Sequence, residues 1–308
     1  MYKKLIILAF VLSCLSNAWV KAFAEDSRGT TGAQFLELPA GARAIAMGSA
    51  YSSINGDPFS AYYNPAGLTT CMDKTQIGLM HAVYLQSVSY EYGVLTTPIS
   101  DMGVLGVSVQ YFAVGNLVEV DQNGIFTGDS FAPNDLSLSA IYATQINTIS
   151  VGGGVKYVKS HIRNSASTFA ADMGLQAIVG QYTLGMSISN IGKGLKLIEE
   201  TSPLPTTARI GGSVHLNPSW LISIDGIASR GSDPVVAVGT EYRLGFNTTT
   251  ILSVRAGYNS RYVSSKLGVI TGISAGAGLD LGNGSIDYSY SPFGDLGSAH
   301  RFSFTVKL

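Results

Sequence analysis

Histidine is the side chain best suited to metal binding and to proton transfer near neutral pH, but the four histidines of this chain form no recognisable site. His81, His161, His215 and His300 are far apart in the sequence, and none has a partner at the spacing of a metal site. The run Gly272 to Gly276 matches the bare G-x-S-x-G pattern, but it lies within a predicted strand and lacks the strand-to-helix turn that makes a nucleophile elbow. A Ser-His-Asp set that meets only in space stays open, because triad members need no fixed sequence order. The pattern favours a protein that is not an enzyme and has no metal or cofactor.

Two other stretches carry groups that bind ions in some proteins. Glu119, Asp121 and Asp129 lie in a long polar segment that could hold Ca²⁺ or a partner, but they lack a regular Ca²⁺-loop spacing, so a solvated loop is favoured. Gly192-Lys193-Gly194 is not followed by the Lys-Ser/Thr and helix of a phosphate-binding loop.

The composition points to a membrane protein built from strands. Only 13% of the 308 residues are Asp, Glu, Lys or Arg, against about 25% in soluble domains. Beyond the N-terminus every apolar run is broken by Gly, Ser or Thr, whereas a spanning helix needs about 20 apolar residues. These features fit an outer-membrane β-barrel in contact with lipid. The formal net charge of −1 argues against a nucleic-acid partner.

Alternation of apolar and polar residues, with turn signals between the runs, predicts an antiparallel barrel of fourteen strands. The predicted strands are 75–84, 87–98, 102–112, 134–145, 149–160, 167–178, 181–190, 206–217, 220–229, 234–245, 250–259, 268–281, 284–291 and 298–308. The last one ends with Phe302, Phe304, Val306 and Leu308 on one face, and it resembles the closing strand that the barrel-insertion machinery reads.

The connections between the predicted strands indicate an orientation. Connections after even-numbered strands are all short, and all the long ones, such as 113–133 and 191–205, follow odd-numbered strands. Outer-membrane barrels have short periplasmic turns and longer external loops. We therefore expect the long loops outside and both termini in the periplasm of a Gram-negative type of bacterium.

Ten charged residues fall on the polar face of these strands, five acidic and five basic. They are Glu91, Asp172, Asp225, Glu241 and Asp287, with Lys156, Arg209, Arg243, Arg255 and Arg301. A basic residue facing the bilayer midplane costs about 2–4 kcal/mol, so we expect all ten in the lumen. The balance favours ion pairs over a wide ion-conducting pore, while a purely space-filling role stays open.

The N-terminus has the pattern of a signal peptide. Lys3 and Lys4 precede a short apolar stretch, and Ala22-Phe23-Ala24 is a cleavage site of the A-x-A type, which predicts a signal peptide over 1–24. Lipoprotein processing at Cys14 is the less favoured alternative. After cleavage at Ala24, Cys71 is the only cysteine, so an intramolecular disulfide is excluded.

Residues 25–71 do not alternate as the later residues do, and they carry the most specific motif of the chain. GTTGAQFLELPAGARAIAMGSAY followed by DPFSAYYNPAGL resembles the N-terminal signature of the PorV/PorQ family, and the Asn-Pro-Ala-Gly-Leu element is similar to the hatch of the FadL superfamily. The resemblance implies that 25–71 is a hatch inside an outer-membrane barrel of residues 72–308. The hatch-motif residues are Arg43, Asp57, Asn64, Pro65, Ala66 and Gly67. From the residues alone, an irregular periplasmic lead-in stays open.

Arg43 lies among small apolar residues, where an unpaired charge would be costly. We expect it to pair with a lumen carboxylate, with Glu91, Asp225 and Glu241 as candidates. The family resemblance implies a docking or shuttle role in type IX secretion, with secretion-system proteins or exported substrates as partners. The alternative is FadL-like transport of a hydrophobic small molecule.

Overall fold

A computed structural model describes residues 29–83, 88–197, 199–247, 249–263 and 268–308 of the chain. The signal peptide predicted over 1–24, and the mature start near Glu25, lie outside the described residues.

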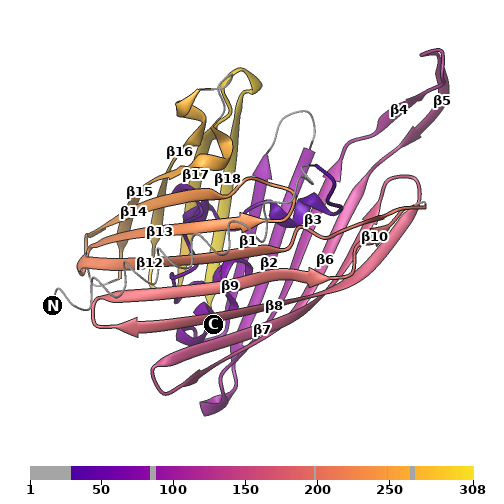
Figure 1. The fold of residues 1–308 in the computed structure, drawn as a ribbon. Coiled ribbons are helices and arrows are strands. Elements are labelled where there is room, and N and C mark those ends of the chain that lie inside the picture. The colour runs from indigo at the N-terminus through magenta and orange to yellow at the C-terminus, as the bar shows by residue number, and fades with distance from the viewer. Residues whose placement is uncertain (1–28, 84–87, 198, 248, 264–267) are drawn as a thin grey trace.

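Fourteen antiparallel strands form a closed barrel, as the sequence predicts (Figure 1). The ring closes because the last strand pairs with both the first strand and the one before it. The barrel strands are β1 (Gln76–Val83), β2 (Val88–Pro98), β3 (Val104–Val114), β6 (Asn134–Ile146), β7 (Ile149–His161), β8 (Ser165–Val179), β9 (Tyr182–Gly192), β12 (Thr207–Asn217), β13 (Trp220–Ser229), β14 (Val235–Gly245), β15 (Ile251–Asn259), β16 (Ile273–Asp280), β17 (Gly284–Pro292) and β18 (Ser298–Lys307).

The strand boundaries differ from the predicted ones mainly at β16, which begins five residues later because a 3₁₀ turn, η5 (Val269–Gly272), takes the predicted start. The loop 113–133 is also more ordered than the predicted solvated loop, since β4 (Leu117–Val120) and β5 (Phe126–Phe131) form a hairpin that extends beyond the barrel in Figure 1. A smaller pair consists of β10 (Leu195–Lys196) and β11 (Thr201–Ser202). The remaining turns of helix in the connections are η3 (Ser100–Met102), η4 (Ser260–Tyr262) and η6 (Gly294–Leu296).

Side chains along each strand alternate between the outside and the lumen, because successive residues of a strand point to opposite faces. On β3, Leu105, Val107 and Val109 are exposed, and on β18 Phe302 and Phe304 are exposed. The residues between them are buried or half-buried on the inner side. Within the described residues, none of the helices is long and apolar enough to cross a membrane.

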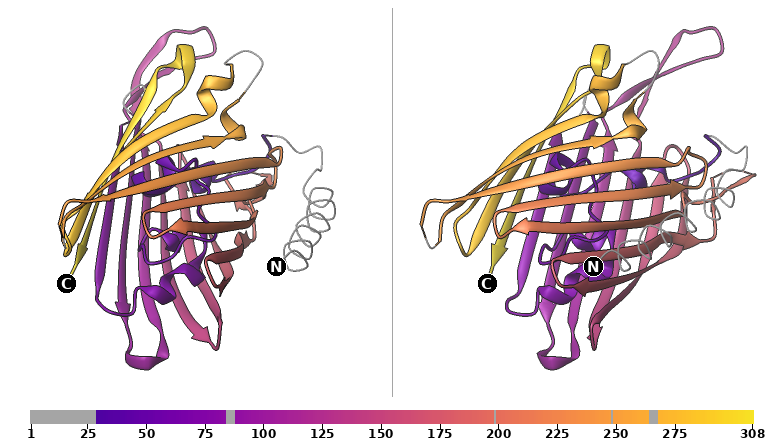
Figure 2. Two further views of the ribbon diagram at one scale, coloured as in Figure 1. Left: turned by 90° about the vertical axis from the view of Figure 1, so that its left-hand side faces the viewer. Right: turned by 60° about the vertical axis from the view of Figure 1, so that its left-hand side comes forward.

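Residues 29–71, called the lumenal segment below, lie inside the ring of strands, where Figure 2 shows their short helices in indigo and purple. The helices are η1 (Gln34–Glu37), α2 (Ala42–Ala46), α3 (Ser60–Tyr63) and η2 (Pro65–Thr70). α2 packs against β15 to β18, and η2 packs against β6, β7 and β8 on the other side of the lumen. Most side chains from Ala40 to Thr69 are buried.

The lumenal segment runs from one end of the barrel to the other. The connections after β2, β6, β8, β12, β14 and β16 meet at one end, called the short-turn end, and the long loops lie at the opposite, long-loop end. Gly29 and Gly32 donate their N–H groups to the carbonyls of Gly231 and Pro203, which belong to long loops. Lys307, by contrast, donates to Asn283 in a short turn. The two ends of the described chain, Gly29 and Leu308, therefore lie at opposite ends of the barrel. The periplasmic placement of both termini stays a prediction, since the mature start predicted near Glu25 lies outside the described residues.

Candidate functional site: the lumenal segment and the cavity beside it

The inner wall of the barrel is flat where the lumenal segment packs, because many strands place a glycine at the middle of their inward face. A Cβ atom at any of these glycines would meet the lumenal segment within 2.7 Å, as at Gly152, Gly174, Gly185, Gly211, Gly239, Gly257 and Gly276. The segment itself contributes Gly48, whose φ of 65° is a left-handed conformation that glycine adopts readily. At Gly152, Gly185, Gly239 and Gly257 the backbone of the segment packs directly on the wall, and at the other three positions its side chains do, so the two fit each other over much of the circumference.

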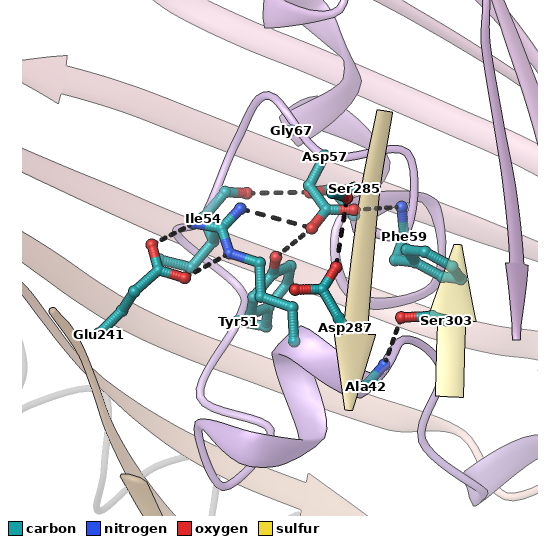
Figure 3. A network of polar contacts seen from close by, with 12 residues as sticks. Ala42, Tyr51, Ile54, Asp57, Phe59, Gly67, Glu241, Ser285, Asp287 and Ser303 are labelled. Atoms are coloured by element: carbon teal, nitrogen blue, oxygen red, sulfur yellow. Dashed lines mark hydrogen bonds and ion pairs between the residues drawn. The ribbon is translucent and has the colours of Figure 1, made fainter. Parts of the chain in front are cut away.

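Arg43 is the centre of a buried polar network that joins the lumenal segment to the wall (Figure 3). Its Nε and Nη2 atoms donate to the two carboxylate oxygens of Glu241 on β14, each at 2.8 Å. Nη1 of Arg43 also lies 3.4 Å from Asp57 of the segment. On the wall, Arg255 Nε is 2.6 Å from Glu241 Oε2, and Arg255 Nη1 is 2.6 Å from Asp287 Oδ1. Among the three expected partners of Arg43, the structure selects Glu241.

Burial and neighbouring charges shift the pKa values of two residues of this network, Arg43 and Tyr51. Burial alone would lower the pKa of Arg43, but Glu241 and Asp57 outweigh it, so the pKa lies above the ordinary value of a guanidinium. Burial raises the pKa of Tyr51, which keeps its hydroxyl protonated as the donor to Asp57 Oδ2 at 2.5 Å. The guanidinium of Arg43 also lies 5.8 Å from the centre of the Tyr51 ring. The bidentate pairing suits a structural lock, because both groups stay charged and each constrains the other's orientation.

Asp225 and Asn64 form two further anchors, and both satisfy buried backbone groups. Asp225 on β13 accepts the N–H groups of Tyr51 and Ser52, at 3.0 and 2.8 Å, rather than pairing with Arg43. Asn64 donates to the carbonyls of Ser52 and Leu175, and its own oxygen accepts the N–H of Ala66 as the cap of η2.

The other hatch-motif residues account for the tight turn that follows Asn64. Pro65 occupies the first position of η2, where a missing N–H is tolerated. Ala66 lies against Gly152 of β7, and a Cβ on Gly67 would lie 2.7 Å from the carbonyl oxygen of Ile54. The motif residues thus lie together in the lumen and bend the chain before β1.

The remaining predicted lumen charges, apart from Glu91, also lie on the inward side. Lys156 and Asp172 pair at 2.8 Å. Arg209 lies over the ring of Tyr63, with its Cζ 5.3 Å from the ring centre. Arg301 donates to Ser291 at 3.0 Å, and Arg243 lines a cavity near the short turns.

The prediction that Glu91 lies in the lumen is wrong, because Glu91 lies on the outward face of β2. Its side chain is 44% exposed, and it pairs at 2.6 Å with His81, which is 52% exposed. The inward positions beside it are Tyr90 and Tyr92, which pack under the lumenal segment. The rings of Phe59 and Tyr92 lie 5.9 Å apart. The lumen beside Glu91 is therefore apolar, and this charged residue of the strand points outward instead.

A cavity of about 340 Å³ lies beside the lumenal segment near the short-turn end. Residues 53–58 of the segment form one side of it, and inward residues from β9 around the ring to β1 form the other. Charged groups of both signs line it, including the Arg43 network, Arg243 and Lys307. Two cavities lined by residues of the long-loop half, one by Glu37 and Arg261 and one by Gly48 and Tyr262, are only about 10 Å³ each. Of these three cavities, which the described residues line, the large one therefore lies toward the short turns and the two small ones toward the long loops.

Sequence reasoning missed one anchor of the segment. Glu37 of η1 pairs at 2.8 Å with Arg261 of η4, in the long loop after β15. Arg261 also donates to Ser229 at the end of β13. The sequence signal that could have found this pair is the scarcity of charge, since Glu37 is the one acidic residue between Gly29 and Asn55.

Comparisons with known proteins agree with this architecture. The family described as "Type IX secretion system protein PorV" matches residues 22–219. No curated protein matches the chain. Similar solved structures include the toluene transporter TodX of Pseudomonas putida, with a TM-score of 0.59 and 13% identity over 87% of this chain and 97% of TodX. The CymD monoaromatic hydrocarbon channel has a TM-score of 0.58 and 12% identity over 87% of this chain and 97% of CymD.

A FadL homologue of Pseudomonas aeruginosa matches with a TM-score of 0.54 and 14% identity, over 86% of this chain and 96% of the homologue. At these identities the likeness to solved structures shows the fold, a FadL-like barrel. The family match assigns the chain to the type IX secretion system. The chain is a non-enzymatic barrel that belongs to the PorV family of type IX secretion system proteins.

Proposed function

We propose that this barrel is a docking component at the cell surface, which receives or hands on exported proteins through its long loops and does not conduct a solute. The observation that carries the proposal is a buried apolar cluster at the long-loop end of the lumen. There, Phe35 and Leu36 of the lumenal segment pack with Leu195 and Leu204 of a long loop in one buried apolar cluster. An external apolar solute would have to displace this cluster before it could enter.

The β4–β5 hairpin offers a surface suited to docking. Phe126 is 71% exposed and Ile125 64% exposed near its tip, with Val118 and Val120 exposed along β4. Exposed apolar side chains on a projecting element are typical of protein contacts. The short-turn cavity supports the same conclusion from the other side, because its charged lining suits water or a polar group and not a hydrocarbon.

The hatch assignment belongs to this proposal. We infer that residues 25–71 act as the hatch and 72–308 as the barrel, with the long loops outside the cell and the short turns in the periplasm.

Capture from native outer membranes tests the docking role. Tagged parent protein should retain type IX secretion components or exported proteins identified by mass spectrometry. Phe126→Ser should lose them, because it removes the apolar tip of the hairpin. Val269→Ser is the matched control, since Val269 is 65% exposed on a different long loop.

Each outcome of this experiment has a definite meaning. Loss in Phe126→Ser alone supports docking through the hairpin, and equal capture by all three proteins rejects the hairpin as the contact. Capture that contains no secretion component or exported protein, together with uptake of an apolar solute by cells carrying the parent barrel, would reject docking and favour FadL-like transport.

A further inference from the structure

Two ion pairs hold the lumenal segment, one near each end of the lumen, and only six positions separate them in the sequence. Glu37 pairs with Arg261 in a long loop, and Arg43 pairs with Glu241 beside the short-turn cavity. Both wall partners belong to the same part of the barrel, since Glu241 lies on β14 and Arg261 directly follows β15.

The chain between these two ion pairs is stiff. Pro39 fixes its own φ and holds the preceding residue extended. Tyr62 donates its hydroxyl to the carbonyl of Leu36 at 3.0 Å, and Tyr63 donates to the carbonyl of Ala40 at 2.8 Å. Both tyrosines belong to α3, so residues 36–40 are tied to a later part of the same segment.

The same ties continue to the cavity. The ring of Tyr63 lies 5.1 Å from that of Tyr51, and Tyr51 donates to Asp57. Asp57 and Asn55 line the short-turn cavity, and Asp57 also contacts Arg43. The segment from Glu37 to Asp57 is thus internally braced.

We propose that this braced segment couples the two ends of the barrel: release of Glu37 from Arg261 at the long-loop end loosens Arg43 from Glu241 and opens the cavity at the short-turn end. The pair is partly exposed to solvent, with the Arg261 side chain 25% exposed and that of Glu37 13%. The external group that fits Arg261 in place of Glu37 is a carboxylate, such as an acidic side chain of a docked protein. The coupling itself does not rest on the docking function, since it concerns contacts within the chain.

A cysteine reporter in the cavity tests the coupling. Asn55→Cys in a Cys71→Ala background places one thiol on the cavity wall of the mature protein, and its reaction rate with a small thiol reagent is measured in nanodiscs. Glu37→Gln should raise the rate about tenfold, as expected when a local opening equilibrium loses one charge-assisted contact. Arg261→Gln should do the same.

The matched control is Arg163→Gln, which breaks the ion pair between Arg163 and Glu119 at the hairpin without touching the lumenal segment. It should leave the rate unchanged. The double variant Glu37→Arg with Arg261→Glu reverses the ion pair, and it should restore the parent rate if the barrel folds. Heat-modifiable gel mobility checks that every variant is folded. Equal rates in the parent, Glu37→Gln and Arg261→Gln would overturn the coupling.

Hexaglutamate peptide tests the trigger. It should raise the rate in the parent but not in Arg261→Gln, and hexalysine should raise it in neither. If the two single variants react faster but hexaglutamate has no effect on the parent, the coupling stands and a carboxylate trigger is wrong.

Discussion

The backbone of Gly48 lies directly against Gly257 of β15, so that a Cβ atom on Gly257 would be 2.0 Å from the Gly48 nitrogen. Asn259, two residues further along the same face, donates to the Gly48 carbonyl at 2.8 Å. This contact is among the tightest between the lumenal segment and the wall, and it leaves no room for a methyl group.

Gly257→Ala should therefore dislodge the lumenal segment near Gly48. We expect a loss of about 1–3 kcal/mol in the free energy of unfolding, because overpacking forces backbone shifts, measured by a bilayer refolding titration. Gly245→Ala is the control, since a Cβ there meets nothing within 4 Å. Equal stability of the two variants would show that the segment does not pack on β15 in the membrane.

Arg43→Ala should loosen the segment while the barrel stays folded. The change removes the bidentate contact to Glu241, although Arg255 still neutralises that carboxylate. Single-channel conductance in planar bilayers should rise above that of the parent, and residues 29–71 should become sensitive to added protease. Arg163→Ala at the hairpin is the control. An unchanged conductance with full protease protection would mean that packing alone holds the segment.

The facing of β3 predicts unequal costs for two neighbouring arginines. Val107 is 51% exposed on the outward face, and Ser108 points into the lumen. Val107→Arg should destabilise the folded barrel by about 2–4 kcal/mol because it meets lipid, and Ser108→Arg should cost less. Equal costs in a refolding titration would mean that the strand is shifted by one residue.

Cysteine labelling on intact cells checks the orientation. A membrane-impermeant reagent should reach cysteines at Asn123 and Lys193 in the long loops, and not at Asn147 or Asn283 in the short turns. Thr30→Cys should also be labelled, since Thr30 is exposed at the long-loop end beside Gly29. Labelling of the short turns from outside would reverse the topology, and failure at Thr30 alone would show that the segment does not reach the surface.

Much of the barrel follows from local sequence, because the alternation of a strand needs no knowledge of its partners. β13 spans 220–229 as predicted, and the other strands lie near their predicted positions. The late start of β16 was not predictable in this way, since Val269 and Ile270 are apolar in either a strand or a 3₁₀ turn.

Glu91 shows the limit of the alternation rule. The rule assigns the polar face to the lumen, but the lumen beside β2 holds Phe59 and Tyr62 of the lumenal segment. An apolar filling attracts Tyr90 and Tyr92 inward and leaves Glu91 outside. The side chains that face inward must match the lumenal segment packed against them. The sequence of one strand contains no information about that segment.

The sequence by itself determined the fold class and the need of Arg43 for a carboxylate, because alternation and an isolated charge are local properties, whereas the hatch assignment rested on the family resemblance. Only the tertiary structure decided that Glu241, 198 positions away, is the partner, and that Asp225 holds the backbone of Tyr51 and Ser52 instead. It also decided that Gly29 lies at the long-loop end. The reason is that closing the ring brings distant strands around one segment, and which inward groups meet depends on the depth at which that segment packs.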